Sequence, residues 1–501
     1  MRVPVVIHLI GTILRLFGLT LLPPAAVALL YAERSDAAAF LVSGVAAAAA
    51  GQLMVRASRA PGEDLRRVEG LAVVAGAWVL AAHAGALPYV WAGMPPVDAL
   101  FESMSGLTTT GATVIRDFGE FGRGMFFWRS LTQWLGGMGV IALFIAVLPR
   151  LGIAGRQLFF AEAPGPTDEK LTPRIRKTAA ALWTVYAGLT ALEVIALVAA
   201  GLPLYDSVCH ALTTLGAGGF SPHPQSLMGY RNPAAEWIVT GFMFLAGANF
   251  ALHYRMLRGE THVFRRDEEF RVYLVLTVAA TVLVAILLGP AAGTIVDRVR
   301  VASFQVLSIL TTTGYASADF NLWNDQSRAV LVALMFVGGC AGSAAGGPKV
   351  VRQILVARYS LLELRRTLHP RGVLPVKLGG RVVPEDVMRE VLVFFLLYLA
   401  VFAVCTVVVV ALGADLVTGF TAAIATLGNI GPGLNVVGPM GHYGDFHPVS
   451  KVVLTAAMWV GRLEVLTVLA LLPPEVWRSA QWAGAGAHVP RAPAPAGGRL
   501  S

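Results

Sequence analysis

Four short Thr-x-Gly motifs are the residues of this sequence whose types and spacing could do chemistry. Each follows an apolar stretch of helical pattern, and the copies lie roughly a hundred residues apart. The glycine can adopt positive φ, and the threonine offers a hydroxyl and a carbonyl oxygen. Four such turns around one axis could replace the water shell of an alkali cation with carbonyl oxygens. The copies are Thr109-Thr110-Gly111, Thr214-Leu215-Gly216, Thr312-Thr313-Gly314 and Thr426-Leu427-Gly428.

The elements that must position these motifs repeat with them. Each unit is predicted to run as an apolar span, a helix of about 10 residues, the turn and a second span. A helix that short cannot cross a bilayer and is typical of a re-entrant segment. Irregular backbone at membrane depth is tolerated where it is buried or lines a wet cavity. The partly negative C-terminal end of each short helix would point at its turn, which favours a cation.

The sequence therefore predicts an all-α membrane protein with four span–pore-helix–span repeats around a pseudo-fourfold pore. Two extra N-terminal transmembrane helices are expected at 1–60, and a disordered tail at 481–501. The pore repeats are expected at 61–160, 161–262, 263–375 and 376–480. The ten apolar spans lie near 5–31, 37–55, 69–91, 125–149, 179–202, 234–254, 272–290, 327–347, 389–412 and 451–472.

Composition supports the membrane class and excludes others. Of 501 residues, 56% are hydrophobic and 14% are charged, whereas soluble domains carry about 25% charged residues. Three scattered cysteines exclude a disulfide framework and a cysteine-based metal site. The sequence shows no nucleophile–base pair and no phosphate-binding loop. We expect no enzymatic activity and no organic cofactor bound to this subunit.

The net charge of +9 is interpreted as a topology signal rather than a nucleic-acid signal. Basic residues gather in alternate loops, near 56–67, 150–177, 255–271 and 349–381. This is the positive-inside pattern, and it predicts that these loops and both termini are cytoplasmic. The basic loops could bind a soluble regulatory ring or anionic lipid headgroups, and the sequence does not separate the two.

Several stretches resemble the TrkH family, the membrane subunits of bacterial Trk potassium uptake systems. They begin at Ser105, Trp128, Gly247, Gly338, Leu427 and Gly461, and the resemblance covers nearly the whole chain. It implies an inner-membrane potassium transporter, with potassium as the transported ion. It further implies a homodimer with one pore per subunit and gating by a cytosolic nucleotide-binding TrkA ring. All four motif glycines are present, which favours potassium over sodium.

The resemblance also assigns two features below the turns. A glycine-rich segment inside the third repeat would be an intramembrane loop that blocks the pore and moves on gating. Arg462 would be a positive charge in the pore beneath the filter. The predicted gate-loop residues are Gly338, Gly339, Gly342, Ser343, Gly346, Gly347 and Lys349.

Alternatives stay open from the residues alone. The glycines of the motifs and of the loop could instead serve close helix packing, and Arg462 could form an ion pair between helices. Glu102 and Glu193 could each pair with a basic residue. The leading function is a potassium conduit gated from the cytoplasm. The alternatives are a potassium carrier coupled to protons or sodium, and a less selective potassium and sodium channel.

Overall fold

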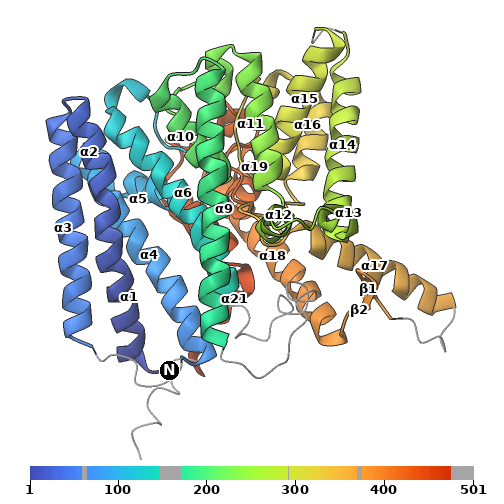
Figure 1. The fold of residues 1–501 in the computed structure, drawn as a ribbon, viewed down its shortest axis with the longest axis horizontal. Helices are drawn as coiled ribbons and strands as arrows, with labels where there is room; N and C mark the ends of the chain where they lie inside the picture. Colours follow the sequence, from blue (N-terminus) through green and yellow to red (C-terminus); the bar gives the residue numbers. More distant parts are fainter. Residues whose placement is uncertain (59–64, 147–170, 291–292, 369–374, 476–501) are drawn as a thin grey trace, which may run out of the picture.

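The computed structural model describes residues 1–58, 65–146, 171–290, 293–368 and 375–475. The predicted tail and the basic segment near 150–170 lie outside these residues. The described chain is mainly helical, as predicted, and Figure 1 shows the helices side by side across the molecule. One antiparallel hairpin, formed by β1 (Lys377–Leu378) and β2 (Arg381–Val382), was not predicted.

Two helical segments precede the repeats, as predicted. The first consists of α1 (Val3–Phe17), the 3₁₀ turn Gly18–Leu21 and α2 (Leu22–Leu30), and the second is α3 (Arg34–Arg56). The segments cross closely because glycines meet: a Cβ on Gly11 would lie 2.8 Å from the Gly51 carbonyl oxygen. Small residues let helix backbones approach in this way in membrane proteins.

Four repeats of span, short helix and second span follow, and we call the short helices α5, α10, α15 and α19 the pore helices. The first repeat holds α4 (Arg67–Trp91), α5 (Pro96–Leu107) and α6 (Arg123–Ala146). The second holds α9 (Leu171–Ala199), α10 (Leu204–Leu215), α11 (Pro233–Ala246) and α12 (Phe250–Leu257), and α13 (Val263–Arg266) follows it. The third holds α14 (Glu268–Leu288), α15 (Ile295–Leu310), α16 (Asp325–Leu334) and α17 (Val350–Leu368). The fourth holds α18 (Glu385–Ala411), α19 (Leu416–Leu427), α20 (Pro448–Arg462) and α21 (Val465–Leu469).

Three of the pore helices, α5, α15 and α19, begin with a residue suited to a helix start. Pro96 occupies the first turn of α5, where its missing N–H is not needed. Asp415 caps α19 and accepts hydrogen bonds from the Val417 and Thr418 amides at 3.0 Å. The side-chain hydrogen bond from Thr418 lowers the pKa of Asp415, so this cap stays ionised. These starts fix where each of the three short helices begins, and hence where its far end delivers the turn.

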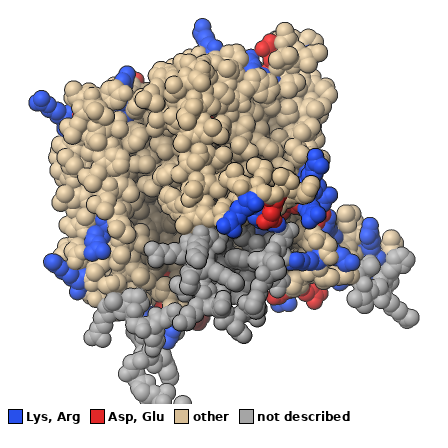
Figure 2. Space-filling view, in the orientation of Figure 1, with Lys and Arg blue, Asp and Glu red and all other residues tan. Residues whose placement is uncertain are grey.

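The outer surface is apolar where a bilayer would surround it. Valine and isoleucine side chains of four long helices are 65–70% exposed, namely Val45, Ile195, Val275 and Val407 at 70, 65, 66 and 66%. Figure 2 shows a broad area without charged atoms, with Lys and Arg gathered toward the lower part and a few at the upper rim. Six described helices are long and apolar enough to cross a membrane. This surface is that of a protein solvated by lipid.

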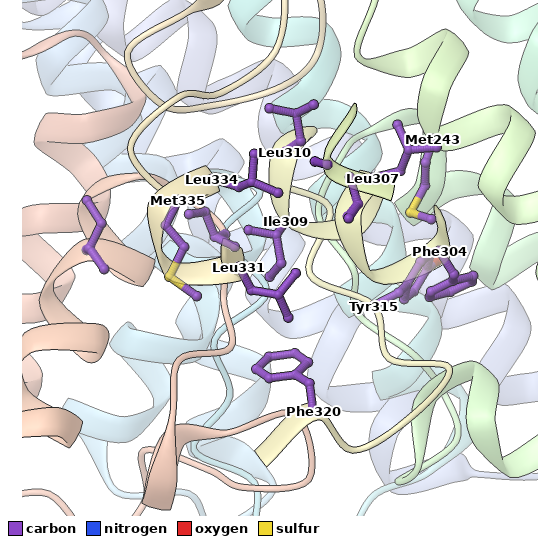
Figure 3. Packing of buried hydrophobic residues seen from close by; sticks show 14 of the residues in the cluster. Met243, Phe304, Leu307, Ile309, Leu310, Tyr315, Phe320, Leu331, Leu334 and Met335 are labelled. Atoms are coloured by element: carbon purple, nitrogen blue, oxygen red, sulfur yellow. The ribbon is translucent and has the colours of Figure 1, made fainter. Parts of the chain in front are cut away.

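The largest core cluster lies around the third repeat. Leu307 and Leu310 of α15 pack with Leu331 of α16 and with Met335, directly after that helix, and Phe320 belongs to the same cluster (Figure 3). Since the cluster is apolar and buried, α15 is held firmly at membrane depth. The packing fixes the end of this pore helix, where a turn begins.

The second spans of repeats two, three and four are interrupted. The glycine-rich segment predicts the break in the third repeat, whereas the breaks within the predicted spans 234–254 and 451–472 were not expected. α11 and α12 meet at a bend of 97°. α16 stops at Leu334, and the irregular segment 335–349, which we call the gate loop, precedes α17. α20 stops at Arg462, and Glu464 follows with a φ of 70°. The second spans of three repeats are therefore broken, each after its pore helix and turn.

Candidate functional site: a ring of four turns

The four pore helices end in the same backbone geometry. The second residue after each helix has positive φ, and so does the glycine two residues later. The glycine φ values are 79, 75, 81 and 97° in chain order. We call these segments turn 1 (Thr109–Gly111), turn 2 (Ala217–Gly219), turn 3 (Thr312–Gly314) and turn 4 (Asn429–Gly431). Two of the four predicted motifs, Thr109–Gly111 and Thr312–Gly314, coincide with turns 1 and 3.

The other two predicted motifs are wrong by three residues. Thr214 and Leu215 lie in the last turn of α10, and Gly216 is its C-cap with a φ of −68°. The motif Thr426–Gly428 occupies the same place at the end of α19, and its glycine has a φ of −79°. Both threonine hydroxyls donate to helix carbonyls four residues earlier, at 2.8 and 2.7 Å. These motifs end the pore helices, and the turns lie directly after them.

The turns close into a ring through their glycines. A Cβ on Gly111 would overlap the carbonyl oxygen of Gly218 in turn 2, and a Cβ on Gly219 would overlap that of Thr313 in turn 3. Gly314 stands in the same relation to Ile430 of turn 4. Gly431 completes the circuit, because its Cβ would lie 2.7 Å from the Thr110 carbonyl oxygen of turn 1. The order is 1–2–3–4–1, so turns 1 and 3 lie opposite each other.

The backbone of the ring leaves carbonyl oxygens unpaired. The amides turn back to their own pore helices, where those of Thr110, Gly218, Gly314 and Ile430 donate to helix carbonyls at 2.8–3.0 Å. In the described residues no donor reaches the carbonyls of Thr109, Ala217, Thr312 or Asn429, although all four residues are fully buried. Buried carbonyls normally have partners. Unpaired oxygens at the negative ends of four helices are an arrangement that favours a cation.

Side chains behind the ring fix its shape. Ser105 and Ser308 each donate to a carbonyl seven residues later, at 2.6 Å, so turns 1 and 3 are supported identically. Tyr443 donates to the Gly431 carbonyl of turn 4 at 2.7 Å. Gln133 donates to the Gly218 carbonyl of turn 2 at 2.7 Å and accepts from the Phe220 amide. The site is preorganised, with each turn held by a neighbouring element.

A buried ion pair supports turn 1. Arg129 of α6 and Glu102 of α5 meet at 2.8 Å, with side chains 2 and 0% exposed. Glu102 also accepts from the Thr113 hydroxyl and the Val114 amide, directly after the turn. The prediction that Glu102 pairs with a basic residue is therefore confirmed. For Glu193, buried on α9, neither oxygen has a hydrogen bond of standard geometry, and Thr214 is the polar side chain that interacts with it.

The gate loop lies against the ring and against the bend of the second repeat. Cys340 donates to the Gly247 carbonyl at 2.9 Å, and Phe250 donates to the Gly342 carbonyl at 3.1 Å. The interrupted second spans of repeats two and three thus supply hydrogen-bond partners for each other's free amide and carbonyl groups. Positive φ marks the predicted residues Gly338, Gly342, Gly347 and Lys349. Gly339 accepts from the Val350 amide, Ser343 donates to the Cys340 carbonyl, and Gly346 donates to turn 3.

Arg462 ends α20 and reaches the gate loop. Its guanidinium donates to the Ala344 carbonyl at 2.9 Å and to the Gly136 carbonyl at 3.2 Å. The side chain is buried, and no acidic group pairs with it in the described part of the chain. The alternative that Arg462 forms an ion pair between helices is therefore not observed among the described residues. The nearby Glu464 does form such a pair, with Arg352 of α17 at 2.6 Å. A positive charge therefore stands beside the loop without compensation.

Sequence reasoning missed several residues that hold this site. Glu269, in the first turn of α14, accepts from the Ala341 amide at 2.8 Å and from the Val351 amide at 3.0 Å, and so ties the gate loop to α17. Asn429 starts turn 4 and donates to the Thr110 hydroxyl at 2.9 Å. Gly428-Asn-Ile-Gly431 carries two glycines, and the second would have signalled the correct register. Nothing in the sequence around Glu269 indicates its partners.

Comparison with known proteins agrees with this arrangement. The TrkH family, described as cation transport protein, matches residues 37–475. The potassium uptake protein TrkH of Salmonella typhimurium is 37% identical over 478 residues, which cover 94% of this chain and 98% of that protein. TrkH of Vibrio parahaemolyticus is 39% identical over 483 residues, covering 95 and 99%.

The crystal structure of the potassium transporter TrkH from Vibrio parahaemolyticus matches with a TM-score of 0.87 at 36% identity. The match covers 95% of this chain and 100% of that one. Sequence and structure agree over the four repeats and most of the N-terminal segment, and this chain belongs to the TrkH family of cation transport proteins.

Proposed function

We propose that this chain takes up potassium across the bacterial inner membrane through the ring of four turns. The observation that carries the proposal is the closed ring with unpaired carbonyls at the ends of four pore helices. Such carbonyls replace the hydration shell of a cation without an acidic side chain. Relatives of similar length and sequence are named potassium uptake proteins. The transport is passage of an ion, not a chemical reaction.

The direct test is rubidium or potassium uptake into proteoliposomes that contain the purified chain. We expect rubidium or potassium uptake to exceed sodium uptake, because a ring of carbonyl oxygens of fixed size coordinates one cation better than another. Equal uptake of both ions supports the less selective channel, and no uptake refutes the proposal. A pH-sensitive dye inside the vesicles tests the alternative of proton coupling, which the buried Glu193 favours. Potassium uptake that drives proton movement at zero membrane potential would establish a coupled carrier.

We infer that a cytosolic nucleotide-binding TrkA-like subunit gates the passage and that the chain forms a homodimer. Support for a docking face comes from exposed basic side chains on α12–α14, α17 and the hairpin, near the gate loop in the fold (Figures 1 and 2). The same charges suit anionic lipid headgroups. These residues are Arg258, Arg265, Arg266, Arg271, Arg365, Lys377 and Arg381.

Neutralising Arg462 should raise rubidium uptake. The Arg462→Gln variant removes an uncompensated positive charge beside the gate loop, and we expect an increase of about fivefold, the effect of about 1 kcal/mol on a passing cation. Uptake per amount of monodisperse protein is the measurement. A variant that expresses poorly and loses its folded fraction would show that Arg462 is structural. Arg462→Lys, which keeps the charge, is the control and should stay near the wild-type rate.

A further inference from the structure

One hydrogen bond joins the gate loop to the ring of turns. The Gly346 amide donates to the Thr312 hydroxyl at 2.6 Å, and both residues are buried. The approach needs glycine, because a Cβ on Gly346 would lie 2.6 Å from the Gly428 carbonyl oxygen and 3.0 Å from the Asn429 Cβ. The loop backbone therefore packs directly against Thr312 of turn 3 and against Gly428 and Asn429, where turn 4 begins.

The equivalent residue of the opposite turn shows what this bond changes. Thr109 begins turn 1 as Thr312 begins turn 3, and both have positive φ, 52 and 58°. The Thr109 hydroxyl is fully buried and has no hydrogen-bond partner. A buried hydroxyl without a partner is costly unless something else, such as a cation, binds it. The two hydroxyls differ in their partners: among the described residues the Thr312 hydroxyl accepts from the gate loop, and the Thr109 hydroxyl has no hydrogen bond.

We propose that the hydroxyls of Thr109 and Thr312, which begin the two opposite turns, contribute to a potassium site, and that the loop occupies this site through Gly346 when it is closed. The inference rests on the proposed function. Hydroxyl oxygens bind a dehydrated cation as carbonyls do, and the unpaired carbonyls of the same residues add further ligands. An amide N–H carries partial positive charge, so it competes with the cation for the Thr312 oxygen.

Because potassium and the loop compete for the Thr312 oxygen, binding of either one weakens binding of the other. Potassium that binds Thr312 weakens the seat of the loop, and withdrawal of the loop returns a ligand to potassium. Arg462 strengthens the seat from the other side, because it binds the Ala344 carbonyl two residues before Gly346. The passage is thus opened in part by the ion that it carries.

The test compares valine at two equivalent positions. In proteoliposomes without any cytosolic partner, Thr312→Val removes one hydroxyl ligand and also the hydrogen bond that holds the loop. Because the closed loop blocks the site altogether, release of the loop outweighs the lost ligand, and rubidium uptake should rise about fivefold, the equilibrium effect of one lost hydrogen bond. Thr109→Val removes a ligand and leaves the loop seated, so its uptake should fall below wild type. Opposite signs from opposite turns support the proposal. Equal changes in both variants overturn it.

A second pair of variants keeps the test decisive if the threonine variants fail to fold. Gly346→Ala pushes the loop away from the Gly428 carbonyl and should also raise uptake, whereas Gly241→Ala, which adds a Cβ to open space on α11, should not. Unchanged uptake in a folded Gly346→Ala protein overturns the inference alone. Absence of rubidium uptake in the wild-type protein overturns the proposed function and this inference together.

Discussion

Replacing Gly431 with alanine should lower potassium uptake by roughly a hundredfold, because strain of a few kcal/mol in the ring acts at about 1.4 kcal/mol per tenfold. The residue has a φ of 97°, which alanine rarely adopts. Its added Cβ would also lie 2.7 Å from the Thr110 carbonyl oxygen and 3.0 Å from the Gly111 carbonyl carbon. The substitution therefore displaces turn 1 as well as turn 4. Rubidium uptake into proteoliposomes measures the loss.

The matched control is Gly428, three residues earlier in the same repeat. Its φ of −79° suits alanine, and an added Cβ would lie 2.9 Å from the Ile424 carbonyl oxygen and 3.0 Å from the end of the flexible Ile430 side chain. We expect Gly428→Ala to lower uptake less than about threefold, since alanine adopts this φ and small shifts of the helix end and of the Ile430 side chain relieve both contacts. The opposite ranking of the two variants would place the filter at the predicted motif and contradict the ring described here.

Removing Glu102 should cost about 3–5 kcal/mol of unfolding free energy, because it leaves the buried Arg129 charge without a partner. The Glu102→Ala variant also frees the Thr113 hydroxyl and the Val114 amide, which the carboxylate holds behind turn 1. Thermal unfolding of detergent-solubilised protein should show a large fall in melting temperature. Replacing both members of the pair with methionine should recover most of the loss, since no buried charge remains.

An exposed pair of the same two residue types serves as the comparison. Arg255 and Glu260 meet at 2.7 Å with side chains 32 and 52% exposed. The Glu260→Ala variant should change stability by no more than about 1 kcal/mol, as exposed ion pairs do. If both glutamate variants lowered the melting temperature equally, burial of the Glu102 pair would not be the cause.

The sequence allowed prediction of the fourfold plan but not of the register of every turn. The motifs Thr109–Gly111 and Thr312–Gly314 coincide with turns 1 and 3 because their threonines lie past the helix end. Thr214 and Thr426 carry the same residue types, yet their hydroxyls bond within the helices. The same Thr-x-Gly pattern thus occupies two different backbone positions, the turn after the pore helix in two repeats and the end of the pore helix in the other two. Only the φ values of the following residues separate a helix cap from a turn.

The broken spans were harder to predict for a different reason. Hydropathy remains high through 234–254, and composition does not reveal that the helix turns by 97° after Ala246. The bend exists because Asn249 caps α12 and because the gate loop binds the freed backbone groups. Those partners are about ninety residues away in sequence, beyond any local pattern. The pairing of Glu269 with the loop is equally non-local.

The ring has one more consequence, which follows from its being folded from a single chain. In an assembly of four identical subunits, a residue that hydrogen-bonds to the gate loop would appear four times, and any mutation would alter all four copies. Here the four turns begin with threonine, alanine, threonine and asparagine, at 109, 217, 312 and 429. Each position can therefore change independently, so that one turn could become specialised for sensing the gate while its opposite kept the ion. A ring folded from one chain allows this division of labour, which a symmetric tetramer lacks.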